Sequence, residues 1–295
     1  MRVVSTPDTG DANDTGAADS TNDGSVTAGA GGSGRPLAPP VVLDELAARY
    51  ATWLALPAPA TVDVSDEDPE QVRAMPVVLR VERSDPPARS ELLAAAASAV
   101  LAVCLDPRAE PGGEWHEAVD TWVRGRIRKV SRRARGAQWA AVHDLPGVTV
   151  THGGAQARAL LPGRVVDAPR AVSKLQISGT DLPADELGPV PTDRPVLWLN
   201  PTVPMTVGKA AAQVGHATMI LAALLHASGE HAALADWNAA GLPCAVRPAD
   251  EDTWARLHPG ATPERAWRKH RVAAVRDAGF TEVAPGTVTV LAAWP

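Results

Sequence analysis

The chain has 295 residues, of which 45% are hydrophobic, enough to bury one large core or two small ones. This composition excludes a protein that is disordered throughout. The formal net charge of −6 excludes a protein that coats nucleic acid through its overall charge, but it leaves room for a local basic patch.

The two cysteines, Cys104 and Cys244, each lie in an apolar run and have no partner at metal-ligand spacing, which is typical of buried thiols in a reducing compartment. The sequence therefore predicts no metal and no cofactor. No uninterrupted apolar run reaches the roughly 18 residues that span a bilayer, and the start of the chain lacks the order of an export signal. We expect a cytoplasmic protein without a membrane partner.

Changes in composition divide the chain into segments. Residues 1–40 are small and polar, and they predict a disordered tail because they offer little to offset the entropy of ordering. Residues 181–193 are rich in proline and acidic side chains and predict a linker. This linker separates a first module, residues 41–180, from a second, residues 194–295.

The two modules resemble copies of one another. In each, a strand that begins at a proline, Pro76 or Pro195, is followed by a loop and an alanine-rich helix. The first copy is expected to lack a counterpart of the strand at residues 244–247, because a Pro-Gly-Gly turn stands at 111–113 instead. These features predict a tandem duplication whose first copy is degenerate.

Two further matches support the duplication. The Asp-Thr-Trp of residues 120–122 aligns with that of residues 252–254. The run that ends at Asp144 aligns with the run that ends at Asp277. On this alignment the first copy retains the late aspartate of the second.

The second module opens with an apolar run, residues 196–199, that predicts a buried strand, and Thr206 is placed to cap a helix that starts at Val207. Along this helix, polar side chains at steps of four and three residues share one stripe at the border of the buried face. They are Lys209, Gln213 and His216. Beside the free amides of a helix amino terminus, such a stripe favours an oxyanion or a phosphate.

Asp277 follows an apolar run and so lies at the carboxyl end of a predicted strand, in a loop where Gly279 permits a tight turn. From there the carboxylate could orient a water, hold an ammonium group or cap the loop backbone. The alternation of strands and helices along the module predicts an α/β fold.

Two motifs of the second module resemble those of the archaeal and eukaryotic type of peptidyl-tRNA hydrolase. The first, residues 208–217, reads Gly-Lys-Ala-Ala-Ala-Gln-Val-Gly-His-Ala. The second, residues 277–291, begins Asp-Ala-Gly-Phe-Thr and ends Pro-Gly-Thr-Val-Thr-Val-Leu. They stand in the order that the family has.

The resemblance implies a small mixed β-sheet between helices, in three layers, and hydrolysis of the ester bond of peptidyl-tRNA without a metal. The functional positions of the family carry over to Lys209, Gln213, His216, Asp277 and Thr281. We expect Asp277, with His216, to position or deprotonate the attacking water. We expect Lys209, Gln213 and the helix amides to neutralise the oxyanion or the terminal phosphate, and Gly208 and Thr281 to bind substrate.

Three departures from the family pattern remove positive charge near this site. Asn200-Pro201-Thr202 stands where the family has Arg-Thr-Asp, Val207 replaces a basic residue, and Phe280 replaces an arginine. An alternative to the enzyme is therefore a non-enzymatic descendant that binds tRNA or a protein partner. The retained set of functional positions favours the enzyme.

The first module carries a dense run of cations on an expected helix: Arg124, Arg126, Arg128, Lys129, Arg132, Arg133 and Arg135. Such a run could bind tRNA phosphates and replace the charge that the second module lacks. The alternative is an exposed helix that acidic residues elsewhere balance.

The first copy lacks the chemistry of the second, since simple register from Pro76 places Ser90, Ala94 and Ala97 opposite the polar stripe. Members of the family that the chain resembles commonly pair as dimers. We therefore expect either a monomeric pseudo-dimer with one decayed site or a homodimer, with peptidyl-tRNA and no DNA as partner.

Overall fold

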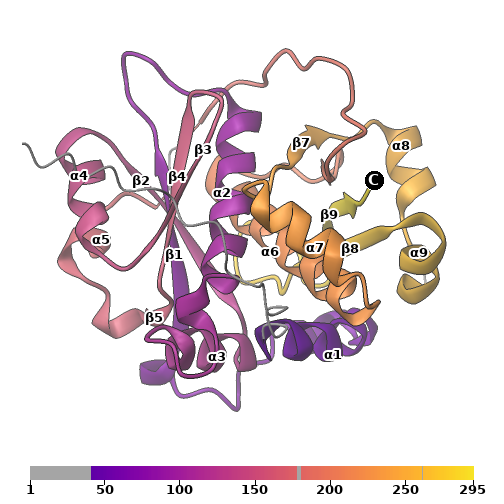
Figure 1. Cartoon of the computed structure of the whole chain (residues 1–295), viewed down its shortest axis with the longest axis horizontal. Coiled ribbons are helices and arrows are strands. Elements are labelled where there is room, and N and C mark those ends of the chain that lie inside the picture. Colours follow the sequence, from indigo (N-terminus) through magenta and orange to yellow (C-terminus); the bar gives the residue numbers. More distant parts are fainter. Residues whose placement is uncertain (1–40, 178–180, 261) are drawn as a thin grey trace, which may run out of the picture. The chain divides into compact units, whose positions relative to one another are not determined.

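The computed structural model, which describes residues 41–177, 181–260 and 262–295, contains two mixed β-sheets flanked by helices (Figure 1). The predicted α/β class is therefore confirmed. The expected tail, residues 1–40, lies outside the described residues. Short 3-10 helices connect several elements: Ala58–Thr61, Pro69–Gln71, Pro107–Ala109, Val142–Asp144 and Val165–Asp167.

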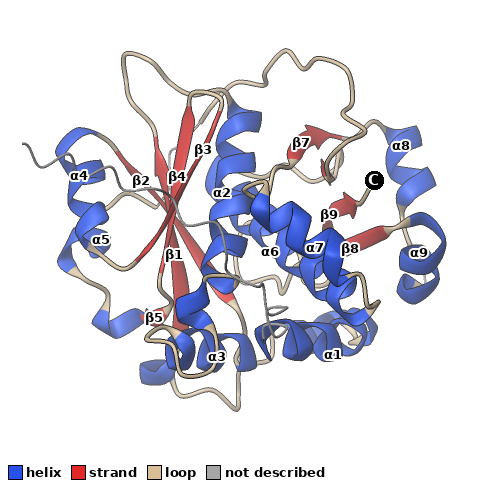
Figure 2. Ribbon diagram, viewed as in Figure 1, coloured by secondary structure: helices blue, strands red, loops and turns tan. Residues whose placement is uncertain are grey.

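The first sheet has the strand order β2-β1-β4-β3, with a short fifth strand beside β1. Its strands are β1 (Arg73–Arg80), β2 (Arg128–Ala134), β3 (Gly147–His152), β4 (Ala155–Leu160) and β5 (Gly163–Arg164). β1 is parallel to β2 and antiparallel to β4, so the sheet is mixed. One face packs on α2 (Arg89–Cys104), and the other packs on α4 (Gly136–Ala141) and α5 (Arg170–Ser173) (Figure 2).

The second sheet has the order β7-β6-β9-β8. Its strands are β6 (Val196–Leu199), β7 (Ala245–Pro248), β8 (Val272–Arg276) and β9 (Val288–Ala293). One face packs on α6 (Val207–Ala227), the other packs on α8 (Glu251–Leu257), and α9 (Pro263–His270) contacts β8. Each sheet thus lies between two layers of helices, as the three-layer expectation states.

The two sheets share one topology. In both, the first strand is central, pairs in parallel with the second and antiparallel with the fourth, and the third lies at the edge. The expectation that the first copy lacks the second strand is wrong, because β2 fills the place that β7 has in the second sheet. The shared topology supports a tandem duplication, which remains a prediction.

The repeat has a fixed spacing of 115 residues in its middle part. Helices α3 (His116–Arg124) and α7 (His231–Ala239) begin and end 115 residues apart. Trp122 donates its indole N–H to the carbonyl of Arg128, and Trp237 donates to that of Pro243, both at 2.9 Å. Trp122 therefore corresponds to Trp237, and the alignment of residues 120–122 with residues 252–254 is wrong.

The predicted match of Asp144 with Asp277 is also wrong. Asp144 ends a 3-10 turn that precedes β3, whereas Asp277 follows the equivalent strand β8. In the first module β3 turns directly into β4 through Gly153 and Gly154. The loop that carries Asp277 in the second module has no equivalent there, because two residues cannot form it.

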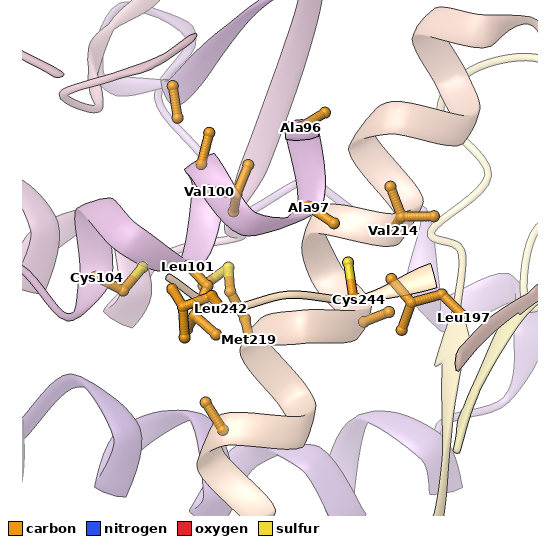
Figure 3. Packing of buried hydrophobic residues seen from close by; sticks show 14 of the residues in the cluster. Ala96, Ala97, Val100, Leu101, Cys104, Leu197, Val214, Met219, Leu242 and Cys244 are labelled. Carbon is orange, nitrogen blue, oxygen red and sulfur yellow. The ribbon is translucent and has the colours of Figure 1, made fainter. Parts of the chain in front are cut away.

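Helices α2 and α6 join the halves along an antiparallel contact. Gly215 of α6 lies opposite Val100 of α2, and the Thr218 hydroxyl donates to the carbonyl of Ala97 at 2.8 Å. Figure 3 labels Val100 and Leu101 of α2 and Val214 and Met219 of α6 in the buried cluster of this region. Buried side chains of both modules belong to one continuous hydrophobic cluster, so neither sheet has a core of its own at this face.

Helix α1 (Val41–Ala55), expected within the first module, hydrogen-bonds to the second. The Tyr50 hydroxyl accepts from the backbone N–H of Ala274 and lies 3.2 Å from its carbonyl. The Trp53 indole donates to the carbonyl of Arg276, whose guanidinium donates to carbonyls at the end of α1. Because β8 is an edge strand, α1 satisfies polar groups that would otherwise stay open.

Helix α6 has 21 residues and contains an 18-residue window with a mean hydropathy of 1.3, so length and composition alone would allow it to cross a membrane. Within the fold, 78% of that window is buried, and the helix carries the polar side chains of Lys209, Gln213 and His216. Its apolar character is accounted for by its position between the two sheets.

Candidate functional site

A cavity of about 630 Å³ opens where elements of both modules meet. Its wall is formed by α1, by the segment that enters β2, by the first half of α6 and by the loop after β8. This volume lies within the usual range for small-molecule sites. The second module contributes Gly208 and the polar residues Thr206, Lys209, Gln213, His216, Arg276, Asp277, Thr281 and Glu282.

Lys209 and Asp277 form an ion pair at the centre of these residues. Lys209 Nζ lies 2.6 Å from Asp277 Oδ2, and the side chains are only 9% and 6% exposed. The ammonium also donates to the Thr281 hydroxyl at 3.2 Å. The sequence-predicted Lys209, Asp277 and Thr281 are thus brought together.

Gln213 links this pair to the sheet. Its side-chain amide donates to Asp277 Oδ2 at 2.8 Å, and its carbonyl oxygen accepts from the buried Thr289 hydroxyl. The backbone N–H of Gly279 donates to Asp277 Oδ1, also at 2.8 Å. Asp277 therefore accepts hydrogen bonds on both oxygens, and its orientation is fixed by helix, sheet and loop together.

The loop that carries Asp277 is held tightly at its ends. The Asp277 N–H donates to the carbonyl of Thr287, and the Gly286 N–H donates back to that of Asp277. Gly279 has φ +88°, and a Cβ there would lie 2.6 Å from backbone atoms of Pro285. Only glycine fits this turn, which explains the Asp-Ala-Gly spacing of the motif.

Thr206 caps α6 as predicted, since its hydroxyl accepts from the Lys209 N–H at 3.2 Å. The same hydroxyl and the Thr206 N–H both donate to the Glu282 carboxylate. This cap fixes the first turn of α6 beside the cavity, with Gly208 in its wall. The amides of that turn have no intrahelical partner and favour negative charge.

His216, three residues after Gln213, has its closest polar contact in the first module. Its Nδ1 lies 2.9 Å from Lys129 Nζ, on β2. Burial, followed by the charges of Lys129 and Lys209, holds the pKa of His216 well below its ordinary value. Burial also lowers the pKa of Lys129, to about 7. His216 is therefore neutral near pH 7.

The basic run of the first module does not form the expected helix, but enters and forms the strand β2. Ile127, just before it, has φ 52°, a left-handed conformation that a β-branched residue rarely adopts. Because strand residues alternate in direction, the seven cations do not form one face. Arg126, Arg128 and Lys129 reach the cavity wall.

Most of these cations have partners within the chain. Arg126 pairs with Asp66 at 2.5 Å, and Arg128 pairs with Glu67. Arg124 pairs with Asp120 and Glu45. Two others bind the segment after α5, since Arg132 donates to the carbonyls of Ser173 and Leu175, and Arg133 donates to Gln176.

The positions that depart from the family pattern are occupied by structural residues or face the cavity. Val207 is fully buried, and the Asn200 side chain donates to the carbonyl of Val288 and accepts from Thr202. Phe280 is 43% exposed, and the Arg128 guanidinium lies 4.9 Å from its ring centroid. A cation of the first module thus lies against the residue that replaces the family arginine.

The corresponding part of the first module carries no such network. Helix α2 begins after Ala88 as α6 begins after Thr206, so Glu91, Ala95 and Ser98 correspond to the polar stripe, one residue later than predicted. Glu91 bonds to the turn at Gly154, and Ser98 lies 3.0 Å from His152. Among residues 41–177, 181–260 and 262–295, no group of His, Cys, Asp and Glu side chains is arranged to hold a metal.

Sequence reasoning missed two features of the site. Thr289 could have been found, because it belongs to the late motif and holds Gln213. The pairing of Lys129 with His216 joins residues 87 positions apart and follows from how the two modules pack, which no local pattern encodes.

Comparison with known proteins gives one family match, and it falls on the second module. Residues 194–295 match the family model described as peptidyl-tRNA hydrolase PTH2, and the match includes all six predicted functional positions of the second module. Searches of curated proteins and of solved structures gave no match. The similarity to the peptidyl-tRNA hydrolase PTH2 family is thus confined to the second module, residues 194–295, which is less than half of the chain.

Proposed function

We propose that the chain hydrolyses the ester bond that joins a peptide to the terminal ribose of tRNA, releasing free tRNA and peptide. The observation that carries this proposal is the buried network of Lys209, Asp277, Gln213 and Thr281 in the wall of one cavity. The family of the second module acts on the same bond, which supports this choice of substrate.

In the proposed reaction, a water oxygen attacks the carbonyl carbon of the ester. Asp277 orients this water through lone pairs not used by Lys209, Gln213 and Gly279, and takes up its proton. The carbonyl oxygen becomes an oxyanion, which Lys209 and the first-turn amides of α6 stabilise. The oxyanion then collapses and the bond to the ribose oxygen breaks, and that oxygen receives the proton that Asp277 took from the water.

The proposed role of His216 differs from that of a base. Its Nδ1 faces Lys129, so Nε2 is the nitrogen left for the substrate. A neutral ring that carries its proton on Nε2 donates a hydrogen bond, which suits the oxyanion. Asp277 remains the acceptor for the proton of water.

We propose that Arg126, Arg128 and Lys129 compensate for the charge that Val207 and Phe280 do not supply. They line the same cavity as Lys209, and Arg128 lies on the Phe280 ring. In this arrangement the 3′ end of tRNA enters beside β2. The duplication would then be a pseudo-dimer whose first half binds and whose second half cleaves, in the cytoplasm, without a cofactor.

Release of labelled peptide from peptidyl-tRNA by the purified chain tests the proposal. We expect turnover by the wild type and a fall on the order of 10²-fold or more in Asp277→Asn, which keeps the shape of the side chain but removes its charge. Asp236→Asn, an exposed change on α7, is the matched control and should retain full activity.

A wild-type chain that binds peptidyl-tRNA without releasing peptide would contradict the proposal and favour the binding-only descendant. Undiminished turnover in Asp277→Asn would contradict the assignment of the site instead.

A further inference from the structure

Two side chains of β2 approach the second module from the first. Strand alternation directs Lys129 and Ser131 to the same side. Lys129 Nζ lies 2.9 Å from His216 Nδ1, and a Cβ on Gly208 would lie 3.5 Å from that of Ser131. Both Lys129 and Ser131 also line the cavity. The first module therefore completes a wall that the second lacks.

The same contact recurs on the other side of the pseudo-dimer with different residues. Cys244 stands 115 residues after Lys129, just before β7, and Ser98 occupies the place of His216 on α2. Cys244 Sγ lies 3.8 Å from Ser98 Oγ, which donates to the carbonyl of Leu242 at 2.7 Å. Both residues there are buried and uncharged at neutral pH, since burial raises the pKa of Cys244 to about 12.

The Lys129–His216 contact differs from the Cys244–Ser98 contact in its charge. In both contacts, a residue at or just before the second strand of one module packs against α2 or α6 of the other module. In one case the pair is uncharged and buried, whereas in the other it is a lysine and a histidine at a cavity. Packing alone does not require charge at this place, because Cys244 and Ser98 fill the equivalent volume.

The surroundings of Lys129 hold its ammonium in one position. Nζ lies 5.2 Å from the centroid of the Trp122 ring, and that ring is itself fixed by its bond to the carbonyl of Arg128. The titratable or charged groups that face the Lys129–His216 pair or line its cavity come from every element around it: Cys104 of α2, Arg49 and Tyr50 of α1, Lys209 of α6, Arg126 and Arg128 at the start of β2, and Arg276, Asp277 and Glu282 of the second module.

We infer that Lys129 is a positioning residue for ester hydrolysis in the second module: it donates to Nδ1 of His216 and so holds the ring with its proton on Nε2, directed to the substrate. This inference rests on the proposed function. Where Lys129 is charged, at and below about pH 7, its ammonium can only donate, so Nδ1 must accept, and the neutral ring then carries its proton on Nε2. The degenerate module thus takes part in the chemistry of the other.

The ring-nitrogen signals of His216 in the full chain, labelled with ¹⁵N, give a readout independent of turnover. We expect an unprotonated Nδ1 that accepts a hydrogen bond in the wild type. In Lys129→Met the Nδ1 signal should move to that of a free acceptor, and the pKa of His216 should rise because a neighbouring positive charge is lost. Lys269→Met, an exposed change on α9, should leave both unchanged.

Turnover of peptidyl-tRNA provides the second readout. In Lys129→Met we expect kcat to fall about 10- to 100-fold with little change in KM. Loss of a group that donates directly to the oxyanion can cost more, up to about 10³-fold in kcat. Lys129→Arg, which keeps a donor, should recover part of the loss. In Lys129→Met the acidic limb of the plot of kcat against pH should move to higher pH.

The outcomes separate this inference from the proposed function. Wild-type turnover together with equal kcat in Lys129→Met, or unchanged His216 signals, would overturn the inference and leave the hydrolase intact. A wild type without turnover would overturn the proposed function and, with it, the catalytic part of the inference; the nitrogen signals would then decide only whether Lys129 orients His216.

Discussion

Lys209 Nζ and Asp277 Oδ2 lie 2.6 Å apart and form an ion pair that joins a helix to a loop 68 residues further along the chain. With 9% and 6% of their side chains exposed, neither charge has solvent to compensate for the loss of the other. The pair is completed by Gln213, Thr281 and Gly279, so the loop has one orientation relative to α6.

Removing one partner of this pair should destabilise the fold strongly. Lys209→Met leaves the Asp277 carboxylate buried without its counter-charge, and we expect a loss of about 3–5 kcal/mol in the free energy of unfolding. Lys209→Met combined with Asp277→Asn should lose less than the sum of the single changes, because no charge is left uncompensated. Urea denaturation measures all three variants; strictly additive losses would contradict the pairing.

Gly215 should be required by the packing of α2 on α6. A Cβ at this position would lie 2.9 Å from Val100 Cγ2, and the branched valine side chain has little freedom to move within a helix. Gly215→Ala gains about 1 kcal/mol of helix propensity but costs about 1–3 kcal/mol in overpacking. We expect net destabilisation in the wild type and net stabilisation in a Val100→Ala background.

The second module could be predicted from the sequence because its signals are local. The Thr206 cap, the stripe of Lys209, Gln213 and His216, and the turn at Gly279 each depend on residues close together in the chain. All the predicted functional positions of this module line or adjoin one cavity. Their roles in catalysis remain predictions.

The first module was predicted less well because its pattern is ambiguous. The run from Arg124 to Arg135 has the composition of a solvated helix, but the parallel pairing of β2 with β1 determines its conformation. The sequence aligned the two copies through the Asp-Thr-Trp match, whereas the structural register aligns Trp122 with Trp237. Each of these indoles donates to the carbonyl six residues further along the chain, although the residues next to them differ. Tertiary pairing overrides local pattern in both cases.

Both thiols should be unreactive in the folded protein. Cys104 and Cys244 are 1% and 5% exposed, and burial raises the pKa of each to about 12. Since the thiolate is the reactive form, a thiol reagent at pH 8 should modify neither residue until the chain unfolds. Rapid modification of one cysteine under native conditions would show that the contact between α2 and the second module opens.

Lys129 should make stability depend on pH in a defined direction. Burial lowers its pKa to about 7 in the folded chain, whereas the unfolded chain titrates near its ordinary value of about 10.4. Between these values the unfolded chain binds more protons, so the contribution of Lys129 to stability improves as pH rises from 7 to 10. The buried charge of Lys129 lowers the free energy of unfolding most below pH 7.

Lys129→Met removes this dependence. Its free energy of unfolding should exceed that of the wild type most at pH 7 or below, and the difference should shrink towards pH 10. Urea denaturation over this range measures it, with Lys269→Met as the control for loss of an exposed lysine. A difference that stays constant with pH would show that the Lys129 ammonium is solvated.

The acidic residues that pair with the basic segment should weaken tRNA binding. Arg126 is paired with Asp66 and Arg128 with Glu67, so RNA phosphates must compete with carboxylates that are already in place. In Asp66→Asn combined with Glu67→Gln, we expect tighter binding of tRNA. We also expect a steeper fall of affinity with salt, by about 0.7–0.9 in the log–log slope for each additional phosphate that the protein neutralises.

Filter binding at several salt concentrations measures this slope. Glu251→Gln combined with Asp252→Asn, two exposed changes in the first turn of α8, provides a control that removes the same charge away from the cavity. An equal rise in affinity in both double variants would indicate a general charge effect. A rise confined to the variant at Asp66 and Glu67 would place the tRNA phosphates at Arg126 and Arg128, beside the Lys209–Asp277 pair.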